Sequence, residues 1–262
     1  MPDLIPVSAE TLAHKYWRRP TDLSHGAQDT FCPLTLSELA QAATAFPIAL
    51  VPNGDSFSLA AVQSFELGKN LFTSPDGRWL SSYVPISYST YPFRLTRTQD
   101  GTVVFCIVNE NDIVTDNNSD HPFFDDEGNL DPLVQQVFDT LSRSYSESEV
   151  LASVISNLHQ LELIAPWDIS ISRGENLQKI EGLFRIDEGA LNTLSDEDFL
   201  QLRTQGALVP AYCQLISMQL LPELIKLDQA YSQMHEDSRN SLSEELKMEF
   251  SNDSGTLDLS NL

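Results

Sequence analysis

The segment from Gly68 to Phe93 constrains the fold of this chain most, because it cannot form one uninterrupted helix or strand. Pro85 and Pro92 each lack a backbone N–H donor and bias the preceding residue towards extended backbone. Residues 74–77, Ser-Pro-Asp-Gly, are a turn signal. A bent segment so rich in rings predicts the wall of a core or of a shallow binding surface. Its aromatic residues are Phe72, Trp79, Tyr83, Tyr88, Tyr91 and Phe93.

The chain is strongly acidic, with 38 acidic and 15 basic residues among 262 and a net charge of −23. Such a field repels phosphate backbones and anionic membrane surfaces, so we expect no nucleic-acid partner and no membrane association. The most apolar window, residues 207–225, contains two prolines and two glutamines, which favours buried helices over a membrane span.

The N-terminus shows no basic stretch followed by an apolar one, so no secretory signal is visible. Cys32, Cys106 and Cys213 are odd in number and far apart, which is typical of buried thiols and of neither a disulfide framework nor a zinc site. Both observations predict a cytoplasmic protein.

Strand and helix signals come in clusters. Residues 46–51 and 57–65 predict a hairpin, residues 93–96 and 103–108 a second, and residues 167–171 and 177–186 a third. The uninterrupted apolar run Val103–Val108 predicts a central strand buried on both faces. Paired strands of this kind predict an α+β fold in which antiparallel hairpins pack against helical hairpins in a single main domain.

Capping signals mark the helix starts. Thr35 and Glu38 form a capping box, Asp131-Pro132 begins a helix, and Ser146 and Ser195 each precede an acidic residue by three positions. The stripes at 133–141 and 150–161 predict two antiparallel helices, and residues 207–221 the most buried one. We expect an irregular arm over 1–30, the α+β domain over 31–221, and an acidic helix and disordered tail over 222–262.

Each candidate group of reactive residues is explained as well by an ordinary structural role as by a functional site. Asp116, Asn118, Asp120 and Glu127 have calcium-loop spacing, but His121 stands where that loop needs glycine, so a solvated acidic loop is expected. The five histidines form no metal-binding pattern, and no nucleophile elbow or phosphate-binding loop is present. The sequence therefore predicts no catalytic residue, no metal ligand and no cofactor.

The chain resembles the SapC family of bacterial proteins. The resemblance lies in Gly68-Lys69-Asn70-Leu71-Phe72, Asp76-Gly77-Arg78-Trp79, Tyr83-Val84-Pro85 and Tyr91-Pro92-Phe93, and downstream in residues 182–187, 198–199 and 206–208. It covers roughly residues 30–221. The family usually has arginine before Tyr-Pro-Phe, where this chain has Ser89 and Thr90.

The resemblance implies a role but no chemistry. The family name comes from a bacterial surface layer, and similar proteins are encoded beside flavin-dependent halogenase-like enzymes and outer-membrane nutrient receptors. An accessory protein that binds such an enzyme, and a self-associating surface-layer subunit at the cell surface, are both implied.

The leading hypothesis is a non-enzymatic protein that acts by binding a protein partner. Because Trp and Tyr concentrate at interface hot spots, Asn70, Trp79, Tyr83 and Tyr91 are the expected anchors. The alternatives are a surface-layer subunit, and an enzyme or small-molecule binder whose pocket lies between the hairpins at 93–108 and 167–186 and uses carboxylates such as Asp187.

Overall fold

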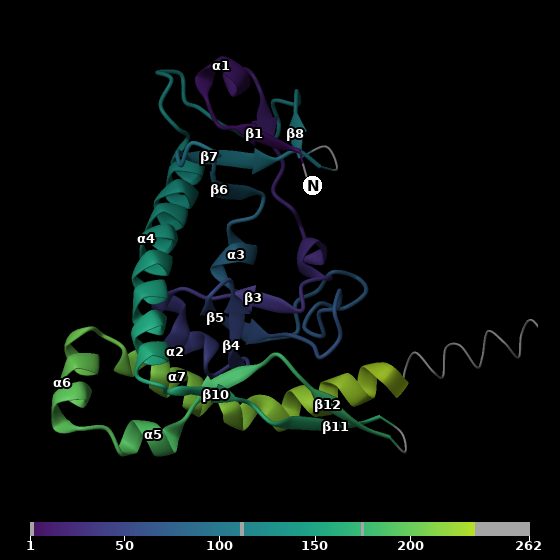
Figure 1. The fold of residues 1–262 in the computed structure, drawn as a ribbon. Helices are drawn as coiled ribbons and strands as arrows, with labels where there is room; N and C mark the ends of the chain where they lie inside the picture. Colours follow the sequence, from purple (N-terminus) through teal and green to yellow (C-terminus); the bar gives the residue numbers. More distant parts are fainter. Residues whose placement is uncertain (1–2, 111–112, 174–175, 234–262) are drawn as a thin grey trace, which may run out of the picture.

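The computed structural model describes residues 3–110, 113–173 and 176–233, and it has the expected α+β fold (Figure 1). One end is built on a three-stranded antiparallel sheet in the order β1-β7-β6. Its strands are β1 (Leu4–Pro6), β6 (Phe93–Arg97) and β7 (Val103–Val108). The predicted hairpin of β6 and β7 is therefore confirmed, and β7 is central as predicted. Only its last three residues are buried, however, and Val103 is exposed.

The other end holds the largest sheet, in the order β10-β13-β4-β5-β3. Its centre is the predicted hairpin of β4 (Ile48–Asn53) and β5 (Ser56–Val62). The remaining strands are β3 (Phe31–Pro33), β10 (Ile164–Pro166) and β13 (Phe184–Ile186). Alternating and β-branched residues in β4 and β5 place Ile48, Leu50 and Leu59 in the interior.

Two smaller antiparallel units complete the strands. The hairpin of β11 (Ile169–Arg173) and β12 (Asn176–Ile180) is confirmed. The returning strand predicted over 177–186 is divided, because Gly182 has a φ of 82° and separates β12 from β13, which joins the large sheet. A second unit has the order β8-β2-β9, with β2 (Tyr16–Trp17), β8 (Val114–Thr115) and β9 (His121–Pro122).

One long helix, α4 (Pro132–Gln160), connects the two ends (Figure 1). Asp131 caps its start by accepting from Leu133 N, with proline at the first helical position as predicted. The prediction of two helices broken near Ser146 is wrong. The Ser146 hydroxyl donates to Ser142 O inside the helix instead of capping a new one.

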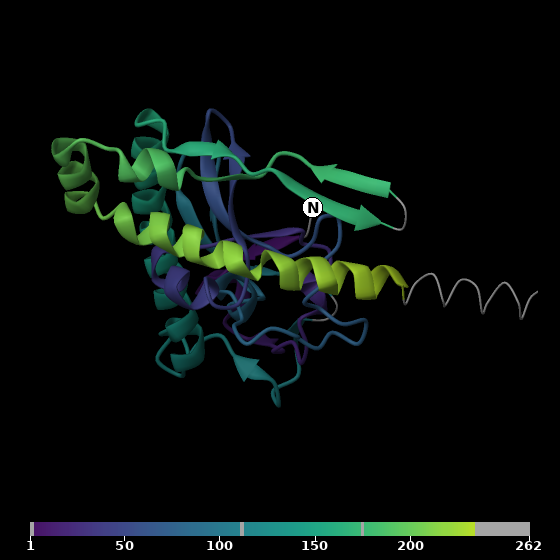
Figure 2. The ribbon, with the colours of Figure 1, turned by 90° about the horizontal axis from the view of Figure 1, so that it is seen from below.

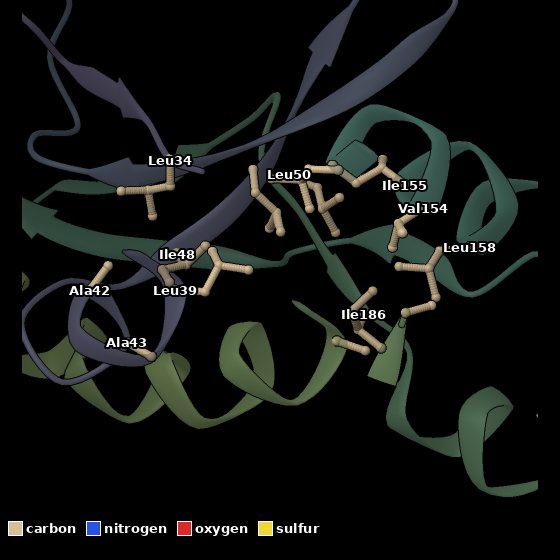
Figure 3. Packing of buried hydrophobic residues seen from close by; sticks show 14 of the residues in the cluster. Leu34, Leu39, Ala42, Ala43, Ile48, Leu50, Val154, Ile155, Leu158 and Ile186 are labelled. Carbon is tan, nitrogen blue, oxygen red and sulfur yellow. The ribbon is translucent and has the colours of Figure 1, made fainter. Parts of the chain in front are cut away.

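The long helix spans two hydrophobic cores. Near its start, Val134 packs with Leu12, Trp17, Phe93 and Phe123. Near its end, the helix joins the core between the large sheet and α7 (Leu208–Ser217) (Figure 3). Buried residues of that core include Leu39, Ile48, Leu50, Leu151, Val154, Ile155, Leu158 and Ile186.

Short helices fill the connections. They are α1 (Ala9–Leu12), α2 (Leu39–Ala42), α3 (Ile86–Ser89), α5 (Glu188–Asn192) and α6 (Asp196–Thr204), with 3-10 turns η1 (Ser24–Gly26), η2 (Leu36–Glu38) and η3 (Met218–Leu220). After η3 the chain stays helical through residue 233, as Figure 2 shows along the underside of the molecule.

Of the regions that flank the domain, the N-terminal arm differs from expectation because it contains regular elements. The arm over 1–30, predicted to be irregular, contains β1, α1, β2 and η1, and the buried Trp17 fixes it to the domain. The helix predicted after residue 222 is present through residue 233. The predicted disordered tail lies outside the described residues.

Candidate functional site

The 68–93 segment is fixed to the arm at two places. Gly77 has a φ of 78°, and a Cβ there would lie 2.8 Å from the Asp22 side chain, so both conformation and space require glycine. Further along, the Tyr91–Pro92 peptide bond is cis, and the Tyr91 ring stacks on His25 with centroids 3.9 Å apart. The segment is therefore an ordered part of the fold.

The buried carboxylate of Glu38 forms hydrogen bonds with the 68–93 segment. Glu38 is 2% exposed, and its Oε2 accepts from the N–H and the hydroxyl of Thr35 at 3.0 and 2.9 Å, which confirms the predicted capping box. Its Oε1 accepts from Ile86 N at 2.7 Å and from the Tyr83 hydroxyl at 3.1 Å. Burial and the Glu38 charge both raise the pKa of Tyr83. Four donors satisfy this carboxylate, which is what a buried charge requires.

Asn70 belongs to a second buried network. Its amide donates to Gly26 O at 2.8 Å and to Gln63 Oε1 at 3.1 Å, and its Oδ1 accepts from Phe72 N at 2.9 Å. The Tyr88 hydroxyl donates to the same Gln63 oxygen at 2.7 Å. Asn70 is only 3% exposed, so its side chain belongs to the fold, and its role as a partner anchor stays a prediction.

The other three predicted anchors are half-buried. The Trp79 indole N–H donates to Tyr83 O at 2.7 Å, and its ring lies against Phe46 and Tyr88. Tyr83 is bound to Glu38, and Tyr91 lies against His25. Their inward faces therefore belong to the fold, and a contact with a partner through their outer edges stays a prediction.

A cleft of about 490 Å³ lies between β3, α3 and α4, and Cys32 and His25 are among the residues that line it. Cys32 lies 3.0 Å from the Ser87 hydroxyl, and burial raises the pKa of its thiol to about 12. Burial lowers the pKa of His25 to about 4, helped by the charge of Arg94. At neutral pH the thiol is protonated and the imidazole is uncharged, so neither an attacking thiolate nor a cationic histidine is formed here.

The predicted pocket between the two hairpins is not formed. The β6–β7 hairpin lies at one end of the molecule and the β11–β12 hairpin at the other (Figure 1). Asp187 is the cap of α5, where its carboxylate accepts from Gly189 N at 3.0 Å and Ala190 N at 3.1 Å. The sequence could not exclude this pocket because it does not show which hairpins pack together.

The acidic loop with calcium-like spacing is tied to the arm. Asp116 pairs with Lys15 at 2.6 Å, and Asp120 accepts from the Thr115 hydroxyl at 2.8 Å and from Arg18 at 3.3 Å. These two carboxylates therefore hold the loop against residues 15–18.

Helix α7 presents polar residues inwards. The fully buried Gln214 amide donates to Ile48 O at 3.1 Å and accepts from Ile186 N at 2.9 Å. Ser217 accepts from Ile48 N at 2.9 Å. Phe184 pairs with Leu50 in the antiparallel register, so Ile186 stands opposite Ile48. The Gln214 side chain bonds to both of these residues and takes the place of a direct backbone hydrogen bond between β4 and β13.

The outer face of α7, defined here as Val209, Tyr212 and Ile216, is apolar. These side chains are 59%, 42% and 55% exposed and lie on one helix face by their spacing. In Figure 2 this helix runs in front of the sheet, on the underside of the molecule. Helix α7 therefore buries Gln214 and Ser217 beside Pro210 and Ala211, while three large apolar side chains remain exposed.

The helical stretch Leu208–Gln233 is long and apolar enough to cross a membrane by length and composition. One such helix is a weak indication, since core helices of soluble proteins meet the same criteria. Here its inner side is packed on the domain, with Leu224 buried beside Leu71 and Trp167.

The chain matches one family model, and no curated protein or solved structure matches it. The model is that of SapC, and the match runs over residues 7–224. The matched range includes the 68–93 segment, the Glu38 and Asn70 networks, the long helix and all of α7. Because the match covers most of the 262 residues, the chain belongs to the SapC family.

Proposed function

We propose that this SapC-family protein is a non-enzymatic accessory protein that binds a protein partner through the outer face of α7. The carrying observation is the exposure of Val209, Tyr212 and Ile216 on a helix whose other face is already packed on the core. Large apolar side chains gathered on one exposed helix face mark interaction surfaces. A tyrosine near the centre supplies the kind of anchor found at hot spots.

The charge of the chain supports a particular kind of partner. The net charge is −23, and the neighbouring helix α6 begins with Asp196, Glu197 and Asp198. A second copy would bring like charges together, whereas a partner with an apolar groove and a lysine- or arginine-rich rim would be attracted. We therefore propose that the outer face of α7 binds an apolar groove with a basic rim on the partner protein.

The reactive groups support a binding role over catalysis. Among the described residues, the buried carboxylate of Glu38 is satisfied by four donors, and the Cys32 thiol has a raised pKa. Neither group offers an available base or nucleophile at neutral pH.

Site-specific photo-crosslinking tests the proposal. A benzophenone amino acid replaces Val209 or Ile216 in the full chain in cells, and the matched control carries it at Leu177, an apolar residue on β12 that is 73% exposed. The proposal expects one protein to crosslink from both α7 positions and not from Leu177, and that protein, once purified, to form a stoichiometric complex. Crosslinking only to a second copy, only to lipid, or equally from all three positions would contradict it.

A further inference from the structure

A groove of about 440 Å³ lies between residues 71–80 and the end of the helical stretch that follows α7. Leu227, the first helical residue in its lining, follows Ile216 by 11 positions, which is roughly 16 Å along a helix. The groove is therefore a separate site from the outer face of α7. Its apolar lining consists of Leu71, Pro75, Leu80, Leu227, Ala230 and Tyr231.

The loop wall of the groove is held by backbone hydrogen bonds. The Ser74 N–H donates to Arg78 O at 2.9 Å, and the Leu80 N–H donates to Phe72 O at 2.8 Å. Leu80 is nevertheless 55% exposed, although it is a large apolar side chain on an ordered loop. The groove therefore has a fixed wall with apolar surface that the described residues leave uncovered.

The helix wall is fixed as well. Leu224 is buried in the same core cluster as Leu71, and the Lys69 ammonium lies 3.8 Å from the centre of the Tyr231 ring. These contacts hold the helix beside the loop, so the groove is part of the ordered fold.

The sequence that follows the helix wall contains an amphipathic stretch. Ser241 and Glu244 have the capping-box spacing, and Leu242, Leu246 and Phe250 recur every four positions, which places them on one face of a helix. Residue 234 lies three positions after Tyr231, so this stretch is joined directly to the groove. The intervening residues 234–240 span up to about 23 Å, which lets the chain reverse and run back along the groove.

We propose that the groove binds residues 241–250 of the same chain as a short amphipathic helix. Leu242, Leu246 and Phe250 lie against the apolar walls, which is the way amphipathic helices enter apolar grooves. Because the segment is attached to the groove's own wall, docking is intramolecular and has a high effective concentration. The composition of the tail predicts disorder, and the proposal assigns order to residues 241–250 alone.

Intramolecular photo-crosslinking of the purified full chain tests the proposal. A benzophenone amino acid replaces Leu80 on one wall or Ala230 on the other, both of which are exposed. The matched control carries it at Val150 on α4, an apolar residue that is 53% exposed and does not line the groove. A mixture of isotope-labelled and unlabelled protein separates contacts within one chain from contacts between copies.

The proposal expects both groove probes to crosslink to residues 241–250 of their own chain, and the Val150 probe not to do so. Leu246→Asp/Phe250→Asp should lower this crosslink yield at least roughly tenfold, because it replaces two apolar contacts with carboxylates that resist burial. Leu257→Asp/Leu259→Asp adds the same charge further along the tail and should keep the yield. No crosslink to the tail, crosslinks spread evenly along it, crosslinks only between copies, or an unchanged yield in Leu246→Asp/Phe250→Asp would overturn the proposal.

Discussion

At the scale of single residues, Glu38 links two parts of the chain that are far apart in sequence. One oxygen caps its own helical turn through Thr35, and the other accepts from Tyr83 and Ile86, which are 45 and 48 positions away. The first half of this arrangement follows from the capping-box spacing. The second half depends on how the proline-bent segment returns, which no local pattern encodes.

Replacing Glu38 with glutamine should lower the free energy of unfolding by about 3 kcal/mol, because an amide nitrogen then faces buried donors. Urea denaturation measures the loss. Glu149→Gln is the matched control, since Glu149 pairs with Arg97 at the surface, and it should cost less than about 1 kcal/mol. Equal effects of the two substitutions would show that the Glu38 network does not hold the segment.

His25 predicts a pH dependence with a defined sign. Burial lowers the pKa of folded His25 to about 4, whereas the unfolded value is near 6.5. Between these values the unfolded chain binds the extra proton, so stability from neutral His25 is present above pH 6.5 and is lost as the pH falls towards 4.

The free energy of unfolding should therefore fall from pH 6.5 to 4 by roughly 1–2 kcal/mol more in the wild type than in His25→Gln, because solvent screens a half-buried group. Denaturation at several pH values measures the difference, and the His25 ring resonances give its pKa directly. A His25 pKa near 6.5, or parallel pH profiles of the two proteins, would refute this prediction.

At the scale of elements, the two helices that matter most differ from their sequence patterns. Helix α4 continues through Ser146 because its two apolar stripes face two different cores, one with Val134 and one with Ile155. Helix α7 buries Gln214 because β4 and β13 separate there and their free backbone groups need a partner.

Gln214→Leu should lower the free energy of unfolding by about 2–4 kcal/mol, although leucine makes α7 look more regularly amphipathic. The substitution leaves Ile48 O and Ile186 N without partners in the interior. The exposed Gln219→Leu is the control and should change stability by less than about 0.5 kcal/mol. Thermal or urea unfolding that shows Gln214→Leu to be neutral would contradict this account.

Elements that depend on neighbouring residues in the sequence could be predicted, and elements that depend on long-range packing could not. The β4–β5 and β6–β7 hairpins rest on alternation and a short turn, and both could be predicted. The division of 177–186 at Gly182 and the outer face of α7 could not, because both depend on which strand β13 finds as a neighbour. The burial of Asn70 could not be predicted for the same reason, since its hydrogen bonds join residues 26, 63 and 72.

At the scale of the whole molecule, a strongly acidic protein presents the apolar outer face of α7 to solvent. The charge of −23 opposes self-association and favours a partner with positive potential. The inner side of α7 packs on β4, β13 and α2, so changes on its outer side should leave the fold intact. Binding and stability can therefore be separated by substitution.

The most direct test compares the affinity of the crosslinked partner, once purified, for the wild type and for the Val209→Glu/Ile216→Glu double variant. Calorimetry measures the affinity, and thermal unfolding and a Leu177→Glu variant serve as controls. The account predicts that the double variant keeps the wild-type unfolding temperature but binds at least about a hundredfold more weakly, while Leu177→Glu binds normally. Unchanged affinity in the double variant would contradict the assignment of α7 as the partner-binding surface.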